Sequence, residues 1–324
     1  VKAWKTWLPI ENVGLYVPGG TAPLISTLLM LAIPAKLAGC RNIVCVTPPN
    51  QKGMIDPAIL YAAKLCGLEK IYSIGGAHAI AALAYGTQTV PKVDKIFGPG
   101  NKYVTEAKVQ VSQDPFGAAL DMPAGPSEVL VIADGSANPE WVALDLLAQA
   151  EHDENAVALC LTTDSQLALK ISTAISKHLE SLTRKSIIQK SLMHSYIIIT
   201  KNLEEAFDIS NHYAPEHLIL NIENAESHIK SIKSAGSVFL GQWSAEALGD
   251  YASGPNHVLP TYGYARNYSG LGVESFMKAT VFQKVTKEGL QALASTVEAL
   301  ADYEGLEAHK MSVSVRKSML EKLL

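Results

Sequence analysis

The chain has 324 residues, a length that favours about two domains, because one domain usually spans roughly 100–200 residues. Hydrophobic residues make up 48% of it and charged residues only 18%, which excludes an intrinsically disordered chain and indicates extensive burial, a subunit interface included. The formal net charge is −4, without a long run of like charge, so nothing suggests the basic face that a general nucleic-acid or anionic-membrane binder needs.

The first half of the chain alternates helical patterns with short β-branched runs. A helix is predicted over residues 23–39, where Gly39 is well placed to end it, and a strand over 42–47. The same alternation continues as helix, strand, helix and strand over residues 56–65, 70–74, 77–85 and 93–97. This βαβ rhythm predicts a mainly parallel sheet covered by helices.

A second α/β unit follows, joined to the first near residues 123–127. Its predicted strands are 128–133, 156–162, 196–200, 217–221 and 237–240, and its predicted helices are 139–151 and 165–182. From about residue 276 the strand signals disappear, and helices are predicted over 290–300 and 311–324. This tail is too small for its own core, so we expect it to dock on another surface, such as a second subunit.

The cysteines and the first residues of the chain indicate the cellular compartment in which the protein is expected. The four cysteines form no CxxC pair, and Cys45 and Cys160 lie in runs typical of buried strands, which predicts reduced thiols and a cytoplasmic protein. Prolines and a lysine interrupt the apolar stretch 22–40, so we do not expect a membrane span. The first ten residues lack Met and a continuous apolar run, so we expect no signal peptide and interpret them as the middle of a longer chain.

Three glycine-rich segments fall at predicted turns of the first unit: VPGGT (17–21), IGGAHA (74–79) and FGPGN (97–101). Such glycines allow the backbone to approach a phosphate closely, although none of the segments matches GxGxxG. Ordinary βα turns remain an alternative. Three such loops in one unit favour a nucleotide-binding surface at the carboxyl ends of the strands.

Gln149 and His152 stand three residues apart at the end of a predicted helix, so they face the same way and could share one ligand. Alone, the pair is a weak metal signal, and the alternative is an ordinary helix end with a histidine near the negative end of the helix dipole. Glu216 and His217 open the apolar strand HLIL after Pro215 and offer two proton-carrying groups, unless they form a plain surface pair.

Asp250 and His257 lie in segment 249–260, which we interpret as a long functional loop because it shows little periodicity. Glu304 and His309, on the tail, would by themselves pass for a solvated helix face. Ser127 has no GxSxG surroundings, which argues against a serine hydrolase. Cys66 has no histidine neighbour, which argues against a thiolate nucleophile.

Across essentially its whole length, the chain resembles the histidinol dehydrogenase family. The blocks that carry this resemblance are VGLYVPGG, KVDKIFGPGN, DMPAGPSEVLVIAD, QAEH, APEHL, SAGSVFLG, GDYASGPNHVLPTYG and EGLEAHK. Compared with that family, an N-terminal segment is missing. The resemblance implies two Rossmann-like parallel-sheet domains and a helical tail exchanged between the protomers of a homodimer. It divides the chain into a remnant of the N-terminal region (1–15), a cofactor domain (16–127), a substrate and zinc domain (128–275) and the swapped tail (276–324).

The resemblance also implies the site residues. The metal ligands fall on Gln149, His152, Asp250 and His309, and the catalytic pair on Glu216 and His217. Substrate contacts fall on Ser127, Gln149, His152, His217, Asp250, His257, Glu304 and His309. NAD contacts fall on Tyr16, Asn101 and His78, where related sequences commonly carry glutamine.

The reaction implied is the zinc-dependent oxidation of L-histidinol to L-histidine through a bound aldehyde, with two NAD⁺ reduced, in the last two steps of histidine biosynthesis. One zinc ion per subunit and NAD are the implied cofactors. Two other functions remain open at this point. A metal-dependent hydrolase would use zinc, Glu216 and water without a dinucleotide, and a non-catalytic module would bind a nucleotide for regulation.

Overall fold

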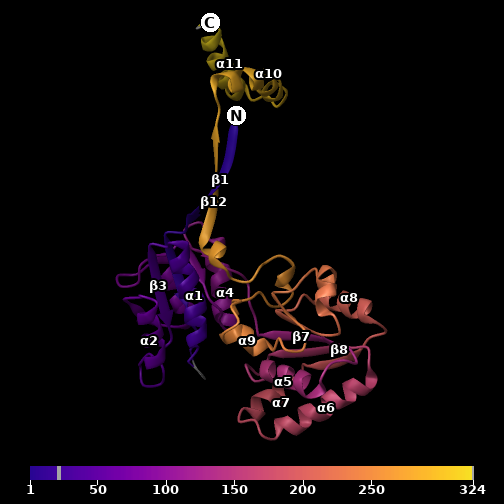
Figure 1. Ribbon diagram of the computed structural model, residues 1–324. Helices are drawn as coiled ribbons and strands as arrows, with labels where there is room; N and C mark the ends of the chain where they lie inside the picture. The colour runs from indigo at the N-terminus through magenta and orange to yellow at the C-terminus, as the bar shows by residue number, and fades with distance from the viewer. Residues whose placement is uncertain (20–22, 323–324) are drawn as a thin grey trace. The chain divides into compact units, whose positions relative to one another are not determined.

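The computed structural model of the chain describes residues 1–19 and 23–322. It divides into two compact units, one formed by Val1–Leu8 with Met277–Leu324 and the other by Pro9–Phe276 (Figure 1). Each unit is described by itself. Within the described residues, no helix is both long enough and apolar enough to cross a membrane.

The larger unit contains two five-stranded sheets, and the strand pairs of both are parallel in the part of the chain that the structure describes. The first has the order β4-β3-β2-β5-β6 and consists of β2 (Asn12–Tyr16), β3 (Asn42–Thr47), β4 (Ile71–Ser73), β5 (Lys95–Phe97) and β6 (Ala119–Leu120). The second has the order β11-β10-β7-β8-β9 and consists of β7 (Glu128–Ala133), β8 (Val157–Thr162), β9 (Tyr196–Ile199), β10 (His217–Asn221) and β11 (Ser237–Leu240). In both sheets the first strand along the chain is central, as in Rossmann-like folds.

Helices connect the strands of each sheet (Figure 1). Those of the first sheet are α1 (Ile25–Ala38), α2 (Pro57–Leu65), α3 (Gly76–Tyr85) and α4 (Lys102–Gln113). Those of the second are α5 (Pro139–Ala150), α6 (Ser165–Leu179), α7 (Lys185–Leu192) and α8 (Leu203–Tyr213), and the short α9 (Glu246–Tyr251) follows its last strand along the chain. Three 3₁₀ turns complete the unit: η1 (Ala225–Ser231), η2 (Tyr264–Arg266) and η3 (Val273–Phe276). All six residues of β7 are buried, which explains the uninterrupted apolar run from Val129 to Ala133.

The predicted α/β class with two parallel sheets is confirmed. The strands 42–47, 128–133, 217–221 and 237–240 lie where the sequence predicts them. Gly39 ends α1 in the left-handed conformation, with φ 85°, and its backbone N–H donates to the carbonyls of Ala35 and Lys36. This conformation suits a residue without a Cβ. Gly39 therefore ends the helix as predicted.

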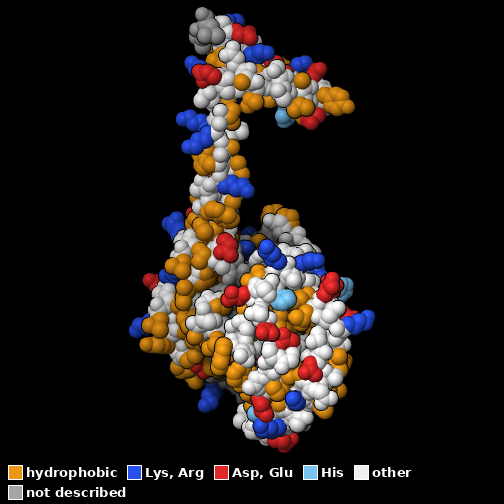
Figure 2. Space-filling view, turned by 45° about the vertical axis from the view of Figure 1, so that its right-hand side comes forward, with side chains coloured by type: hydrophobic (Ala, Val, Ile, Leu, Met, Phe, Trp, Pro, Cys, Tyr) orange, Lys and Arg blue, Asp and Glu red, His pale blue; other side chains and the backbone are white. Residues whose placement is uncertain are grey.

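The smaller unit corrects the prediction that strands end near residue 276. Strand β12 (Met277–Lys284) pairs with β1 (Lys2–Pro9), and the two predicted helices follow as α10 (Lys287–Tyr303) and α11 (Glu307–Glu321), while residues 323–324 of the second prediction lie outside the described residues. Among the described residues of this unit, the buried hydrophobic side chains are Ala294 and Ala301. Many larger ones are exposed, and Figure 2 shows apolar side chains along the strands and helices of this unit.

A buried ion pair anchors the loop after β5 to α4. Lys108 pairs with Asp121, and its Nζ donates to the Gly98 carbonyl at 2.9 Å. Asp121 in turn accepts from the Gly98 N–H at 2.7 Å. Gly98 has φ +116°, and a Cβ there would lie 2.1 Å from the Tyr16 carbonyl oxygen. The pair therefore holds a loop segment whose close backbone approach requires glycine.

We expect Lys108→Met to lower the free energy of unfolding by about 3–5 kcal/mol, because it leaves the Asp121 carboxylate buried without its cation. The matched control is Lys177→Met, which removes the same charge from a solvent-exposed pair with Glu140 and should cost less than about 1 kcal/mol. Urea unfolding of both variants measures the difference. Equal small losses would contradict the assignment of Lys108 as an anchor.

Candidate active site and metal centre

The predicted catalytic pair lies at the amino edge of the second sheet. His217 opens β10 and is in register with Val129 of β7 and Ser237 of β11. Helix α5 connects two parallel strands, so it runs back toward this edge and carries Gln149 to it in its last turn, with His152 just beyond. The sequence therefore brings an acid–imidazole pair and a helix end to the same place.

This amino edge adjoins the carboxyl edge of the first sheet. Only residues 121–127 separate the end of β6 from the start of β7, so the two edges lie within the reach of a short loop. The Gly125 N–H and Thr261 Oγ1 also form a hydrogen bond at 2.5 Å across the junction. A molecule bound at the carboxyl edge of the first sheet, where dinucleotides bind in such folds, would face Glu216 and His217.

Local backbone structure holds the catalytic pair in place. Helix α8 ends at Ala214, which is buried and has the unusual φ of 56° for a residue other than glycine. The N–H of Gly236 then donates to the Pro215 carbonyl, and the N–H of Ser237 to the Glu216 carbonyl, at 2.9 and 2.8 Å. A Cβ at Gly236 would lie 2.6 Å from the Glu216 carbonyl oxygen, so this approach requires glycine.

Three oxygens around Nδ1 of His217 determine where its proton lies. The Glu128 carbonyl is 3.2 Å away, and carboxylate oxygens of Glu216 and Glu246 are each 3.6 Å away. These acceptors favour the proton on Nδ1, which leaves Nε2 as the basic atom, 4.0 Å from Asp250 Oδ1. Burial lowers the pKa of His217 to about 3, so its imidazole is neutral and Nε2 carries no proton.

The Glu216 carboxyl is buried beside it. Its Oε2 accepts the backbone N–H of Glu128 at 2.8 Å. Burial raises the pKa of Glu216 well above its ordinary value, and burial likewise raises the pKa of Glu128 to about 7. A carboxylate with a raised pKa is a stronger base once ionised, which suits it to the activation of water.

Three potential metal ligands converge next to this pair. One ligand atom each of His152, Glu246 and Asp250 lies within 4.8 Å of the others. Glu246 and Asp250 are four residues apart on α9, so they share one face of the helix. Gly249 allows α9 to pack closely, since a Cβ there would lie 2.6 Å from the ring of Phe239.

This arrangement corrects the interpretation of residues 249–260 as a continuous loop, because α9 extends to Tyr251 and includes Asp250. It also reveals Glu246, which the sequence analysis did not single out. The i, i+4 spacing of Glu246 and Asp250 was the available signal, but spacing alone does not distinguish such a pair from a solvated helix face.

The residues present fit a divalent cation. Gln149 has no solvent-exposed surface, yet neither atom of its side-chain amide has a hydrogen-bond partner within residues 1–19 and 23–322. Glu246 Oε2 is buried without a partner as well, and burial raises the pKa of Asp250. Unpaired buried polar atoms are costly, and a cation beside them would offset that cost. Imidazole nitrogen together with amide and carboxylate oxygens is a donor set that suits zinc.

The other predicted substrate and metal residues are placed as follows. Ser127 is half-buried directly before Glu128, and its carbonyl accepts the Val157 N–H at 3.1 Å. His257 lies beside Asp250, with Nδ1 3.2 Å from the Asp250 carbonyl. Glu304 and His309 belong to the smaller unit, where both are exposed, so their part in the metal centre stays a prediction.

The predicted cofactor residues lie at the carboxyl edge of the first sheet. Tyr16 ends β2, and its hydroxyl accepts the Gly76 N–H at 3.1 Å. Asn101 caps α4 through its side-chain oxygen, which leaves its amide nitrogen for a ligand. His78 is exposed on α3. Residues 20 and 21 of the VPGGT segment lie outside the described residues.

The cysteines supply no nucleophile to this site. All four thiols are free, and burial raises the pKa of Cys45 and of Cys160 to about 12. Burial also raises the pKa of Cys66, at the end of α2. A thiol is nucleophilic only as its thiolate, so these shifts agree with the prediction that catalysis uses no cysteine.

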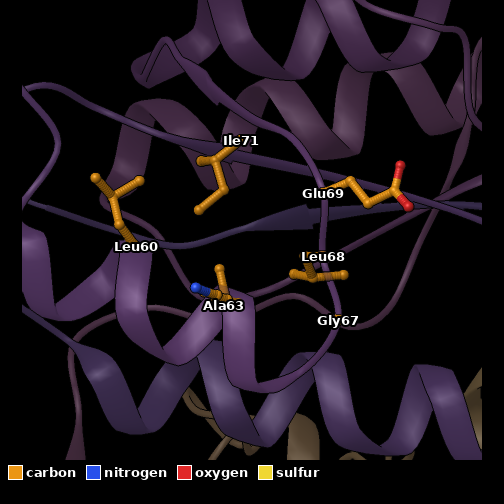
Figure 3. Close-up of a pocket in the computed structure, with 7 residues that line it drawn as sticks. Leu60, Ala63, Gly67, Leu68, Glu69 and Ile71 are labelled. Carbon is orange, nitrogen blue, oxygen red and sulfur yellow. The ribbon is translucent and has the colours of Figure 1, made fainter.

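A cavity of about 440 Å³ lies elsewhere, between α2 and the edge strand β4. Figure 3 shows Leu60, Ala63 and Ile71 around it, while the Glu69 carboxylate points away from them. Its lining includes none of the predicted site residues, and its wall offers mainly apolar side chains. We therefore place the candidate site at the junction of the two sheets and not in this cavity.

Comparison with known proteins identifies relatives over nearly the whole chain. Residues 1–317 match the family model described as histidinol dehydrogenase. Histidinol dehydrogenase from Mannheimia succiniciproducens is 55% identical over 313 residues, which cover 97% of this chain and 72% of that protein. The crystal structure of histidinol dehydrogenase from Elizabethkingia anophelis matches with a TM-score of 0.96 and 55% identity, covering 98% of this chain and 73% of that one.

A more distant structural relative shares the fold alone. An acetylating aldehyde dehydrogenase from Geobacillus thermoglucosidasius matches with a TM-score of 0.57 and 13% identity, over 88% of this chain and 77% of that one. At that identity the likeness shows a common arrangement of elements and carries no site residue over.

Proposed function

This chain belongs to the histidinol dehydrogenase family and is an enzyme, and from that premise we propose that it oxidises L-histidinol to L-histidine in two successive two-electron steps, with two NAD⁺ reduced, at the end of histidine biosynthesis. The observation that supports this most directly is the convergence of the Glu216–His217 pair with His152 and Asp250 at one edge of a sheet. A buried base beside a set of metal-ligating atoms suits the oxidation of a bound alcohol.

We propose that Gln149, His152 and Asp250 hold a zinc ion together with His309 from the tail of a second copy. When bound, the zinc ion would hold the imidazole and amine nitrogens of the substrate and so orient the alcohol carbon. The side-chain amide of Gln149 supports this assignment, since it has no hydrogen-bond partner among the residues that the structure describes. Ser127 and Glu304 are the further proposed substrate contacts, beside the metal ligands and His217.

The two catalytic residues have separate tasks in this proposal. In the first oxidation Nε2 of His217 takes the proton of the substrate hydroxyl and then releases it to solvent, and in the second it takes a proton from the hydrated aldehyde. Between them, Glu216 removes a proton from the water molecule that adds to the aldehyde. When bound, the nicotinamide of NAD⁺ would accept the hydride in each oxidation. Water supplies the second carboxylate oxygen of the product, so the atoms balance.

For the cofactor we propose Tyr16, Asn101 and His78 as contacts, and residues 16–127 as the cofactor-binding domain. The reversal of strand order between β2 and β5 supports this placement, because ligands of such parallel sheets bind at the carboxyl ends of the strands where the order reverses. An imidazole at position 78 offers one hydrogen bond, whereas an amide offers a paired donor and acceptor. Residues 128–275 are the proposed substrate and zinc domain, and 276–324 the swapped tail.

Metal removal tests the proposal. We expect chelation to abolish histidinol-dependent NADH formation while the far-ultraviolet circular dichroism stays unchanged, because α5 and α9 are parts of a formed α/β unit and need no metal to fold. Added Zn²⁺ should restore turnover, and Mn²⁺ or Co²⁺ can substitute since the ligands are nitrogen and oxygen. Retained turnover in a sample shown to be free of metal would refute the zinc assignment.

A further inference from the structure

A chain of hydrogen bonds links helix α1, which covers the first sheet, to residues 249–260, which contain the proposed metal ligand Asp250. Thr27 on α1 is only 3% exposed, and its Oγ1 lies 3.3 Å from Nε2 of His257. The other ring nitrogen of His257, Nδ1, lies 3.2 Å from the backbone carbonyl of Asp250. Beside it, the side-chain amide of Asn256 donates to the Met30 carbonyl of α1 at 2.7 Å.

The direction of each bond follows from donor and acceptor chemistry. The Asp250 carbonyl can only accept, so Nδ1 of His257 carries the proton and donates it. In a neutral imidazole Nε2 then has a lone pair, and the Thr27 hydroxyl is its donor. Both ring nitrogens are thus engaged within the protein, which leaves neither of them for the substrate.

We propose that Thr27 is a positioning residue for the metal centre: through His257 it holds the backbone of Asp250, and with it the face of α9 that carries the ligands, against α1. This inference rests on the proposed zinc site and goes beyond it, because it assigns His257 a structural link instead of a substrate contact. Removing a group that orients a metal ligand without binding the metal itself typically lowers metal affinity by about 10–100-fold.

The test compares Thr27→Val, which keeps the shape of the side chain and removes the hydroxyl, with Thr27→Ser, which keeps the hydroxyl. Zinc affinity of the full-length protein is measured by competition with a chromophoric chelator. We expect Thr27→Val to bind Zn²⁺ about 10–100-fold more weakly and Thr27→Ser to stay close to the wild type. The second expected result concerns His257→Phe, which keeps a ring but loses both nitrogens. It should weaken zinc binding similarly, and adding Thr27→Val to it should cause no further loss.

The outcomes separate this inference from the proposed function. Unchanged zinc affinity in Thr27→Val, with a zinc-binding wild type, would overturn the role of Thr27 and leave the metal site intact. Equal weakening in the valine and serine variants would also overturn it, because the hydroxyl would not be the cause. A wild type that binds no zinc at all would instead overturn the proposed metal site, and this inference with it. Should the valine variant fail to fold, an unchanged zinc affinity in His257→Phe refutes the link.

Discussion

Glu216→Gln is expected to slow the oxidation of the aldehyde to the acid by roughly 10²–10⁴-fold while largely sparing the oxidation of the alcohol. Glutamine keeps an oxygen that can accept the Glu128 N–H, so the local geometry should persist while the base is lost. Only the second half of the reaction requires activation of water, which is the task proposed for Glu216. The variant should therefore form about one NADH rapidly per site and then stall.

His217→Asn is the companion variant and should impair both oxidations, because the same Nε2 is proposed to take a proton in each. Supplying histidinol and the aldehyde separately, with stopped-flow detection of NADH, resolves the two half-reactions. Zinc content and circular dichroism of each variant serve as the controls. Equal loss of both half-reactions in Glu216→Gln, with zinc and fold intact, would refute the division of tasks.

Homodimers of His152→Ala and of His309→Ala should each be nearly inactive, yet subunits refolded together should regain activity. The reason is the proposed sharing of each site, in which Gln149, His152 and Asp250 come from one protomer and Glu304 and His309 from the other. Mixed dimers would then contain one doubly altered site and one intact site. Random pairing makes about half of the dimers mixed, so recovery to roughly a quarter of wild-type activity is expected.

The exposed apolar side chains of the smaller unit support this expectation, since Trp4, Trp7 and Leu300 would be covered by a partner. Differently tagged subunits allow the mixed dimers to be purified and counted before the assay. No recovery in purified mixed dimers would mean that His309 completes the site of its own chain.

The strands that form the core could be predicted from sequence because their signal is local. Residues 129–133 and 218–220 are apolar and mostly β-branched or leucine, and burial on both faces requires that pattern. Strand β12 was missed because it pairs with β1 from the other end of the chain. A pairing between residues so far apart in the sequence does not show in the local pattern of residues.

The site was predicted only in part, for a similar reason. Family blocks identify Gln149, His152, Glu216, His217 and Asp250, but Glu246 belongs to a six-residue helix that depends on the packing of Gly249 against Phe239. The proton position on His217 depends on oxygens from Glu128, Glu216 and Glu246, which lie far apart in the sequence. Such contacts between distant elements have no signature in residue spacing.

The stoichiometry of NADH formation tests the central claim most directly. A known, limiting amount of L-histidinol is added to the zinc-loaded protein with excess NAD⁺, and NADH absorbance is followed to its end point while the product is identified by chromatography. The proposed function predicts two NADH and one L-histidine for each histidinol consumed. Zinc-loaded, folded protein that consumes histidinol without forming NADH, or forms no NADH at all, would contradict it.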